Sequence, residues 1–352
     1  MRRAGTALLA ATACLALLPG APAWAGTSGH HPGHALRDCT GTAPITCHFA
    51  VAPGTYDVTA VLGGADAGST AVTAESRRTL LPATPTAAGQ RLTRTFSVNV
   101  REPEGEPTGP SGSPGLDLFF GGDAPRLADL RVTASRRTQL FLAGDSTVCD
   151  QIAAPYTGWG QQLPQFFRGG RGGLSVANYA DSGEGSGSFL ADPRLFPTMR
   201  PLIRKGDTVL IQFAHNDKQT TAADYRANLT ALLDGVRTRG GEPVLVTPIV
   251  RRWFNDDGTL DNGTALHING LGVNLPAEMR ALAASQRVPL IDLTALTRQL
   301  VERLGPEGSK ALYLTEEARD NTHTSTHGAT EFARLVLGEL RALALVPDGV
   351  IR

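Results

Sequence analysis

The sequence changes its pattern near residue 138, and this change constrains the fold more than any other feature. Beyond that point, short apolar segments alternate with segments of helical periodicity. Apolar strands that alternate with helices predict a parallel sheet covered by helices on both faces. We therefore expect residues 138–352 to form an α/β domain with three layers, α/β/α. The expected strands are 139–143, 174–178, 208–213, 243–248 and 288–292, and the expected helices are 225–239, 276–285, 294–304 and 328–345.

Residues 38–137 have a different pattern, without strong helical periodicity. Short segments alternate between apolar and polar residues or run apolar, and clusters of Gly and Pro separate them. This pattern is typical of strands joined by turns and predicts a β-sandwich domain. The clearest strand segments are 56–62, 93–100 and 115–120. A chain of 352 residues also exceeds the size at which a single core usually stops growing, which favours two domains.

The N-terminus has the three parts of a secretory signal peptide. Met1-Arg2-Arg3 is basic, residues 7–18 are apolar, and Ala23-Trp24-Ala25 offers small residues for cleavage. We expect residues 1–25 to be removed and residues 26–37 to form a disordered polar leader. The alternative, a membrane anchor, requires a longer apolar stretch. The richness in Ala, Gly and Arg suggests a bacterial source, so we expect a secreted, extracellular bacterial protein that does not bind the membrane after cleavage.

Three cysteines remain after the expected cleavage. Cys39 and Cys47 lie close together in the chain, and an exported protein permits disulfides, so we expect them to form a bridge. Cys149 follows Ser146 by three residues and offers a second nucleophile. An unpaired cysteine behind an apolar strand is more often a small buried side chain, and we favour that interpretation.

Charge and metal-binding patterns exclude several classes of function. The chain has 33 basic and 33 acidic residues, which gives no electrostatic footprint for nucleic acid. His323 and His327 are four residues apart, as in some zinc helices, but no third ligand has a suitable spacing. We expect neither a metal nor another cofactor.

Two segments carry the groups of a serine hydrolase. Ser146 lies in a Gly-Asp-Ser-Thr turn after the first expected α/β strand, and Asp320 precedes His323 by three residues. An imidazole can accept the serine proton, and a carboxylate fixes the tautomer of that imidazole. Asn216 follows the third strand, so it should reach the same edge of the sheet as Ser146. Each residue also has an ordinary structural alternative: Ser146 as a helix N-cap, Asp320 as a turn residue, His323 as a helix cap and Asn216 as a loop-stabilising amide.

Four motif blocks in this order resemble those of the SGNH (GDSL-like) hydrolase superfamily, and within it the rhamnogalacturonan acetylesterase family. The likeness covers residues 138–345. The blocks are Gly144-Asp145-Ser146-Thr147, Asn178-Tyr179-Ala180-Asp181-Ser182-Gly183, His215-Asn216-Asp217 and Asp320-Asn321-Thr322-His323, with Thr157-Gly158-Trp159-Gly160 and Arg251-Arg252-Trp253-Phe254 as further support.

The resemblance implies a flavodoxin-like SGNH fold and assigns roles to five residues. Ser146 becomes the nucleophile, His323 the general base and Asp320 its orienting partner. The developing oxyanion is held by the backbone N–H groups of Ser146 and Gly183 and by the side-chain amide of Asn216. We therefore predict a carboxylic ester hydrolase that forms an acyl-enzyme on Ser146.

The same resemblance implies a secreted esterase that removes O-acetyl groups from a plant cell-wall polysaccharide such as rhamnogalacturonan. Its partner would be the acetylated polysaccharide or oligosaccharide, and we expect a monomer. Residues 38–137 resemble galactose-binding-like sandwiches. Two alternatives stay open: a lipid or aryl esterase on the same fold, and a non-catalytic glycan-binding protein. The expected substrate contacts are Asp145, Thr147, Trp159, Arg251 and Arg252. Trp159 could instead fill the core, which we slightly favour. Arg251 and Arg252 could face an acidic galacturonate chain or equally form surface salt bridges.

Glu184 and Ala214 stand where the closest relatives would be expected to have arginine and glycine. Residues 262–275 also diverge. These departures leave the identity of the polysaccharide open.

Overall fold

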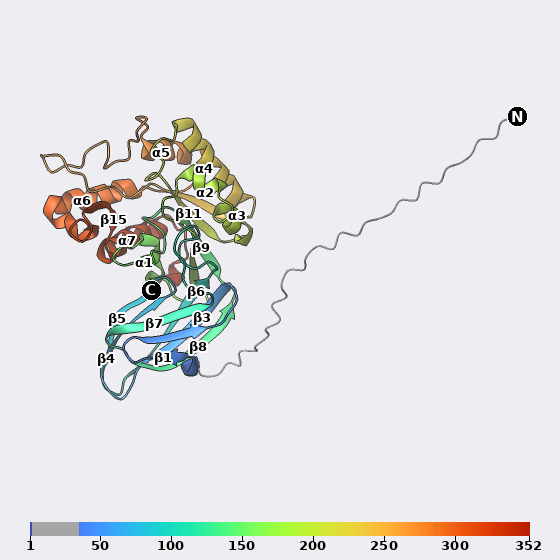
Figure 1. Ribbon diagram of the computed structural model, residues 1–352, viewed down its shortest axis with the longest axis vertical. Coiled ribbons are helices and arrows are strands. Elements are labelled where there is room, and N and C mark those ends of the chain that lie inside the picture. The colour runs from blue at the N-terminus through green and yellow to red at the C-terminus, as the bar shows by residue number, and fades with distance from the viewer. Residues whose placement is uncertain (2–34) are drawn as a thin grey trace. The chain divides into compact units, whose positions relative to one another are not determined.

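A five-stranded parallel sheet organises the C-terminal two thirds of the protein, in the order β10-β9-β11-β12-β13 (Figure 1). Residues in β10 and β11 are buried along their whole length, as expected for a sheet covered on both faces. The strands are β9 (Thr138–Gly144), β10 (Leu174–Asn178), β11 (Thr208–Gln212), β12 (Glu242–Val246) and β13 (Leu290–Ile291). The five predicted strands are therefore present, with small shifts at their ends.

Helices cover both faces of this sheet, and alternate residues of β9 show how. Leu140 and Leu142 pack with α1, α6 and α7, whereas Phe141 and Ala143 pack with α2 to α5. Figure 1 shows α6 and α7 on one side of the sheet and α3 and α4 on the other. The helices are α1 (Trp159–Gln162), α2 (Ser186–Ala191), α3 (Phe196–Met199), α4 (Ala222–Arg237), α5 (Leu275–Gln286), α6 (Leu293–Gly308) and α7 (Thr326–Ala342). The predicted three-layer arrangement is confirmed.

Polar side chains cap the N-termini of the long helices. The hydroxyl of Thr221 accepts a hydrogen bond from the backbone N–H of Asp224 at the start of α4. Ser325 accepts one from Gly328 at the start of α7. Such caps satisfy backbone donors that have no partner within the helix. Because Ser325 follows His323 by two residues, this cap also fixes where the segment carrying His323 ends.

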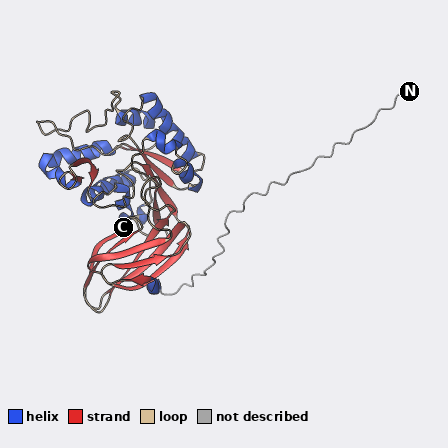
Figure 2. Ribbon diagram, in the orientation of Figure 1, coloured by secondary structure: helices blue, strands red, loops and turns tan. Residues whose placement is uncertain are grey.

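The preceding residues form two antiparallel sheets, in the orders β1-β2-β7-β4-β5 and β6-β3-β8. One apolar cluster contains side chains from both sheets, among them Phe120 from β7 and Val58 from β3. Figure 2 shows that this part of the chain consists almost entirely of strands and loops. The strands are β1 (Cys39–Thr40), β2 (Ile45–Phe49), β3 (Gly54–Gly63), β4 (Gly68–Ala74), β5 (Arg78–Thr86), β6 (Arg91–Val100), β7 (Leu116–Ala124) and β8 (Leu127–Ser135).

The predicted disulfide joins β1 to β2. Cys39 and Cys47 are direct partners in the antiparallel register, with an S–S distance of 2.02 Å. Cys149 is a free, buried cysteine.

The computed structural model describes residue 1 and residues 35–352. Residues 2–25 of the expected signal peptide and residues 26–34 of the expected leader lie outside these described residues, whereas Ala35–Asp38 forms a short 3₁₀ helix. Residues 35–352 lie within one compact unit, so the expected domain boundary near residue 137 stays a prediction. Among the described residues, no helix combines the length and the apolar character needed to cross a membrane.

Candidate active site

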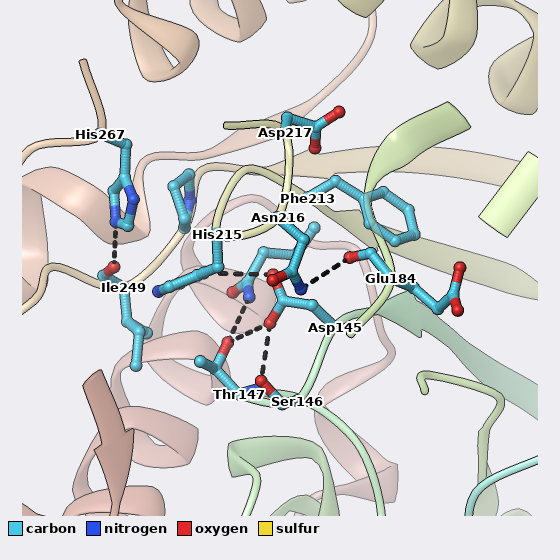
Figure 3. Close-up of polar contacts among 12 residues, drawn as sticks. Asp145, Ser146, Thr147, Glu184, Phe213, His215, Asn216, Asp217, Ile249 and His267 are labelled. Carbon is cyan, nitrogen blue, oxygen red and sulfur yellow. Dashed lines mark hydrogen bonds and ion pairs between the residues drawn. The ribbon is translucent and has the colours of Figure 1, made fainter. Parts of the chain in front are cut away.

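Ser146 lies in the turn that follows β9, and the carboxylate of Asp145 shapes this turn. Asp145 Oδ1 accepts hydrogen bonds from the backbone N–H of Thr147 at 2.9 Å and from its hydroxyl at 2.7 Å. The carbonyl of Asp145 accepts from the N–H of Val148 at 2.9 Å. These bonds hold the tight turn beyond the carboxyl end of the strand, where ligands of parallel sheets bind (Figure 3).

Asp320 and His323 lie on β15 (Asp320–Thr324), which pairs in antiparallel fashion with β14 (Tyr313–Leu314). The pairing of this short strand with β14 shifts register between Tyr313 and Leu314. Asp320 Oδ1 accepts hydrogen bonds from the backbone N–H groups of Thr322 at 2.7 Å and His323 at 2.9 Å. These bonds bring the carboxylate back to the imidazole.

A continuous line of hydrogen bonds connects Asp320, His323 and Ser146. His323 Nδ1 lies 2.6 Å from Asp320 Oδ2, and His323 Nε2 lies 2.9 Å from Ser146 Oγ. An ionised carboxylate can only accept, so Nδ1 carries a proton and Nε2 presents its lone pair to the serine hydroxyl. Sequence positions 177 residues apart therefore meet in the order required for serine activation.

The environment of Asp320 keeps it ionised. Partial burial on its own would raise the pKa of Asp320, but hydrogen bonds from the His323 side chain and from the backbone of His323 and Thr322 outweigh it. The pKa of this carboxyl therefore lies well below its usual range. A permanent carboxylate beside Nδ1 fixes the tautomer in which Nε2 can accept a proton.

The segment of residues 155–157 fixes β15 against the serine loop. The backbone N–H of Thr157 donates to the carbonyl of Thr324 at 3.2 Å, and the Thr324 hydroxyl donates to the carbonyl of Thr157 at 2.5 Å. The ring of Tyr156 meets the His323 ring edge-on, with centroids 5.4 Å apart. These contacts hold the imidazole on the side of Ser146.

Gly183 and Asn216 follow the carboxyl ends of β10 and β11, on the same edge of the sheet as Ser146. Gly183 is exposed and has φ +83°, while a Cβ at this position would meet no atom within 4 Å. The left-handed backbone conformation, rather than close packing, therefore favours glycine at this position. One N–H of the Asn216 amide donates to the carbonyl of Glu184 at 3.1 Å (Figure 3). The amide has a second N–H for another acceptor.

A second histidine–aspartate pair lies on the other side of the serine turn, and sequence reasoning missed it. His215 Nδ1 is 3.1 Å from Asp145 Oδ2, and both side chains are almost fully buried (Figure 3). The His215 ring meets the His267 ring at 4.4 Å between centroids, and His267 Nε2 donates to the carbonyl of Ile249 at 2.7 Å. Burial lowers the pKa of His215, although Asp145 opposes this shift. The pair is therefore a neutral imidazole donating to a carboxylate.

Most of the residues expected to contact substrate are buried in the protein interior. Asp145 and Thr147 are buried and bonded to each other, as described above. Trp159 is 1% exposed, belongs to the core on one face of the sheet, and donates from Nε1 to Gln212 at 3.0 Å. These three positions leave no surface for a substrate, because their polar atoms and their rings are enclosed by the protein.

The two expected arginines differ. Arg252 is 9% exposed and donates to Ser309, Asn321 and the carbonyl of Pro306, so its guanidinium connects the end of α6 with β15. Arg251 is only half-buried and donates to the carbonyl of His215 at 2.9 Å. It lines a cavity of about 130 Å³ together with Lys218.

The buried Cys149 belongs to the scaffold of the serine loop. Its Sγ lies 3.4 Å from Ser182 Oγ and 3.7 Å from the carbonyl of Ser146. Burial raises the pKa of this thiol, so it remains protonated and a poor nucleophile. Gln151 Nε2 donates to the same carbonyl of Ser146 at 3.0 Å and to Ser182 Oγ at 3.3 Å. The loops after β9 and β10 are thus tied together.

The GDSL-like Lipase/Acylhydrolase family matches residues 142–329, a segment that begins at the end of β9 and includes all the residues of this site. The chain belongs to this family. As a GDSL-like acylhydrolase, it is a carboxylic ester hydrolase, and the resemblance inferred from the motif blocks is confirmed.

Individual relatives agree with the assignment. The GDSL-like chain is 38% identical over 223 residues to the rhamnogalacturonan acetylesterase RhgT of Bacillus subtilis, covering 59% of this chain and 91% of that protein. It is 28% identical over 224 residues to the uncharacterized esterase YxiM of the same organism, covering 61% of this chain and 54% of that protein. The crystal structure of YxiM matches 86% of this chain and 81% of its own, with a TM-score of 0.54 and 23% identity, which shows a shared fold.

Proposed function

We propose that this hydrolase is a serine acetylesterase in which Ser146, His323 and Asp320 carry out acyl transfer. The observation that carries the proposal is the line of two short hydrogen bonds from Asp320 through His323 to Ser146 Oγ. Loosely related polar residues would not align a carboxylate, an imidazole and an alcohol in this order. The line is the arrangement through which a weak hydroxyl becomes a nucleophile.

The reaction has two balanced halves. Ser146 Oγ attacks the carbonyl carbon of the acetyl ester while its proton passes to His323 Nε2. The tetrahedral oxyanion collapses, the bond to the sugar oxygen breaks, and Nε2 gives its proton to that oxygen. A water molecule then repeats both steps on the acetyl-serine, which releases acetate and restores the hydroxyl.

Three donors are proposed for the oxyanion: the backbone N–H groups of Ser146 and Gly183 and the second N–H of the Asn216 amide. The bond from Asn216 to the carbonyl of Glu184 supports this role, because it fixes the amide orientation before substrate arrives. Loss of one such donor typically costs about 3–4 kcal/mol of transition-state stabilisation.

The proposed substrate is an acetylated plant polysaccharide such as rhamnogalacturonan. The 38% identity to a relative named as a rhamnogalacturonan acetylesterase supports this choice. The cavity beside His215 gives further support, because Arg251 and Lys218 line it and no Asp or Glu does. Two cations in a small cavity favour a neighbouring sugar that carries a carboxylate.

We further propose that the protein is secreted after cleavage near residue 25 and acts as a monomer. The disulfide between Cys39 and Cys47 supports an oxidising compartment. For residues 38–137 we propose a galactose-binding-like β-sandwich domain. The two antiparallel sheets that share one apolar cluster support it.

The substrate proposal is tested by acetate release from acetylated rhamnogalacturonan and acetylated xylan, with p-nitrophenyl palmitate as a long-chain ester. Purified mature protein should release acetate fastest from the pectic substrate, and the Ser146→Ala protein should release none. Rapid cleavage of the palmitate without acetate release from either polysaccharide would instead identify a lipid esterase. Sugar binding without any ester cleavage would identify a glycan-binding protein.

A further inference from the structure

The loop between β6 and β7, residues 101–115, leaves the antiparallel sheets and contacts the loops of the candidate active site. The backbone N–H of Thr108 donates to Asp181 Oδ1 at 3.2 Å, and the Thr108 hydroxyl donates to Asp181 Oδ2. Asp181 is fully buried and precedes Gly183 by two residues. A buried carboxylate requires such donors, so Thr108 helps to fix the start of this segment, together with the hydrogen bond from the Asp181 N–H to the carbonyl of Gly144 at 3.0 Å.

Glu106 from the same loop contacts the next residue of the segment. Burial raises the pKa of the Glu106 carboxyl, and interactions with the side chain and backbone of Ser182 oppose this shift, so the carboxyl lies beside Ser182. Ser182 Oγ in turn lies 3.3 Å from Gln151 Nε2, which also donates to the carbonyl of Ser146. Thr108 and Glu106 therefore interact with Asp181 and Ser182, the two residues immediately before Gly183. Gln151 connects Ser182 with the backbone of Ser146.

The base of the loop is anchored on the Ser146 side. Arg78 and Arg101, both buried, form ion pairs with Asp150 at 2.8 and 3.6 Å. The guanidinium of Arg101 also lies 5.2 Å from the centroid of the Tyr179 ring. A Cβ added at Gly105 would come within 2.9 Å of Ile152, so the loop backbone passes close to the serine loop. These anchors give the loop a fixed position from which to hold Ser182 and Gly183.

We propose that Thr108 and Glu106 are positioning residues for the oxyanion donor at Gly183, so that the antiparallel-sheet part of the chain completes the active site. The inference rests on the proposed role of Gly183 in ester hydrolysis. Gly183 is exposed and its left-handed backbone has no side chain to hold it. Its N–H direction therefore depends on residues 181 and 182, which the loop fixes.

The Thr108→Val protein tests the proposal with a nearly isosteric change. Valine keeps the backbone N–H but removes the hydroxyl donor, so Asp181 loses one of its partners. Because misplacement of a catalytic group by about 1 Å can cost about a hundredfold in rate, we expect a loss of roughly tenfold in kcat for p-nitrophenyl acetate. KM should change less than about twofold, since ground-state binding does not use the oxyanion donor.

A tetrahedral inhibitor separates positioning from general damage. Phenylboronic acid adds to the serine oxygen and mimics the oxyanion. Its Ki should rise by about the same factor as kcat/KM falls in Thr108→Val. Thr108→Ser restores the hydroxyl and should recover most of both losses. Thr84→Val is the matched control, because the Thr84 hydroxyl donates only to the nearby carbonyl of Pro82.

The outcomes are distinct. Unchanged kcat and Ki in Thr108→Val, or equal losses in Thr108→Ser, would overturn the positioning role. A fall in melting temperature with normal kcat below that temperature would also overturn it, because Thr108 would then only stabilise the fold. Failure of the proposed function itself would appear separately, as a wild-type protein that does not hydrolyse p-nitrophenyl acetate or a Ser146→Ala protein that does.

Discussion

Two histidine–aspartate pairs flank the serine turn, and they differ in what surrounds them. The side chains of His323 and Asp320 are 30% and 21% exposed, whereas those of His215 and Asp145 are 2% and 0% exposed. His323 Nε2 reaches Ser146 Oγ, while His215 Nε2 is buried without a hydrogen-bond partner in the described part of the chain. The same chemical groups therefore occupy a reactive environment and a structural one.

A histidine–aspartate pair is therefore not by itself a catalytic base. A proton acceptor needs an unshared Nε2 lone pair directed at the nucleophile and access for substrate and water. The inner pair lacks the first, because His215 Nδ1 is bonded to Asp145 and its Nε2 has no hydrogen-bond partner among the described residues, but it holds the carboxylate that shapes the serine turn. We therefore expect the outer pair to control rate and the inner pair to control stability.

The largest expected effect comes from the nucleophile that both pairs adjoin. Ser146→Ala removes the oxygen that forms the acyl-enzyme, and loss of a nucleophile of this kind costs about a millionfold in kcat. Hydrolysis of p-nitrophenyl acetate measures it. The melting temperature should stay within a few degrees of wild type, since only one oxygen is lost. Retention of more than about a tenth of the activity would mean that another group performs the attack.

Asp320→Asn should have the next largest effect. An amide beside Nδ1 can donate, which favours the tautomer with the proton on Nε2 and takes away the acceptor for Ser146. In Ser-His-Asp enzymes this change costs about 10⁴ in kcat. The melting temperature should fall only slightly, because the position is partly exposed. A kcat within a factor of ten of wild type would remove Asp320 from the proposed triad.

Asp145→Asn is the matched change in the inner pair, and it should mainly cost stability. It replaces a buried charge-assisted hydrogen bond, a type of bond worth about 1.5–3 kcal/mol. Urea unfolding measures this loss, and we expect kcat to fall no more than about tenfold. If Asp145→Asn abolished activity in a protein as stable as wild type, the distinction between the two pairs would be wrong.

Glu75→Gln should give the smallest effect and one that depends on pH. Burial is the main cause that raises the pKa of Glu75 to about 8, from an ordinary value of 4.5. Between these values the folded protein keeps a proton that the unfolded chain has released, so this contribution to stability is present in acid and is lost as pH rises towards 8. A glutamine does not titrate. The unfolding free energy of Glu75→Gln should therefore gain about 1 kcal/mol on wild type between pH 6 and pH 7.

Glu242→Gln is the control for this titration, because Glu242 is exposed at the start of β12. Its difference from wild type, measured over the same range of pH, is the baseline for the change seen with Glu75→Gln. A difference for Glu75→Gln that changes no more than this baseline would show that Glu75 is ionised in the folded protein.

Local patterns predicted much of the molecule. The alternation of apolar strands and amphipathic helices gave the parallel sheet, because burial on both faces imposes that pattern directly. The motif blocks pointed to Ser146, Asp320 and His323, and the structure brings these three side chains together. The close spacing of Cys39 and Cys47 and the expected export of the protein predicted their pairing, which the structure shows between β1 and β2.

Features that depend on tertiary contacts were not predictable. Nothing near Thr108 indicates that it meets Asp181, 73 positions away, and nothing near His215 indicates Asp145 as its partner. Arg252 looked suited to an acidic substrate, but its guanidinium is used by three groups of the protein. Long-range packing decides such roles, and the sequence around each residue does not carry that information.

Covalent labelling can show whether His323 activates Ser146. Diisopropyl fluorophosphate forms an O–P bond with an activated serine and releases fluoride. Tandem mass spectrometry of the digested protein should find one labelled residue, Ser146, and no label in the His323→Ala protein. A label on another serine such as Ser182, or equal labelling of Ser146 in the absence of His323, would contradict the account.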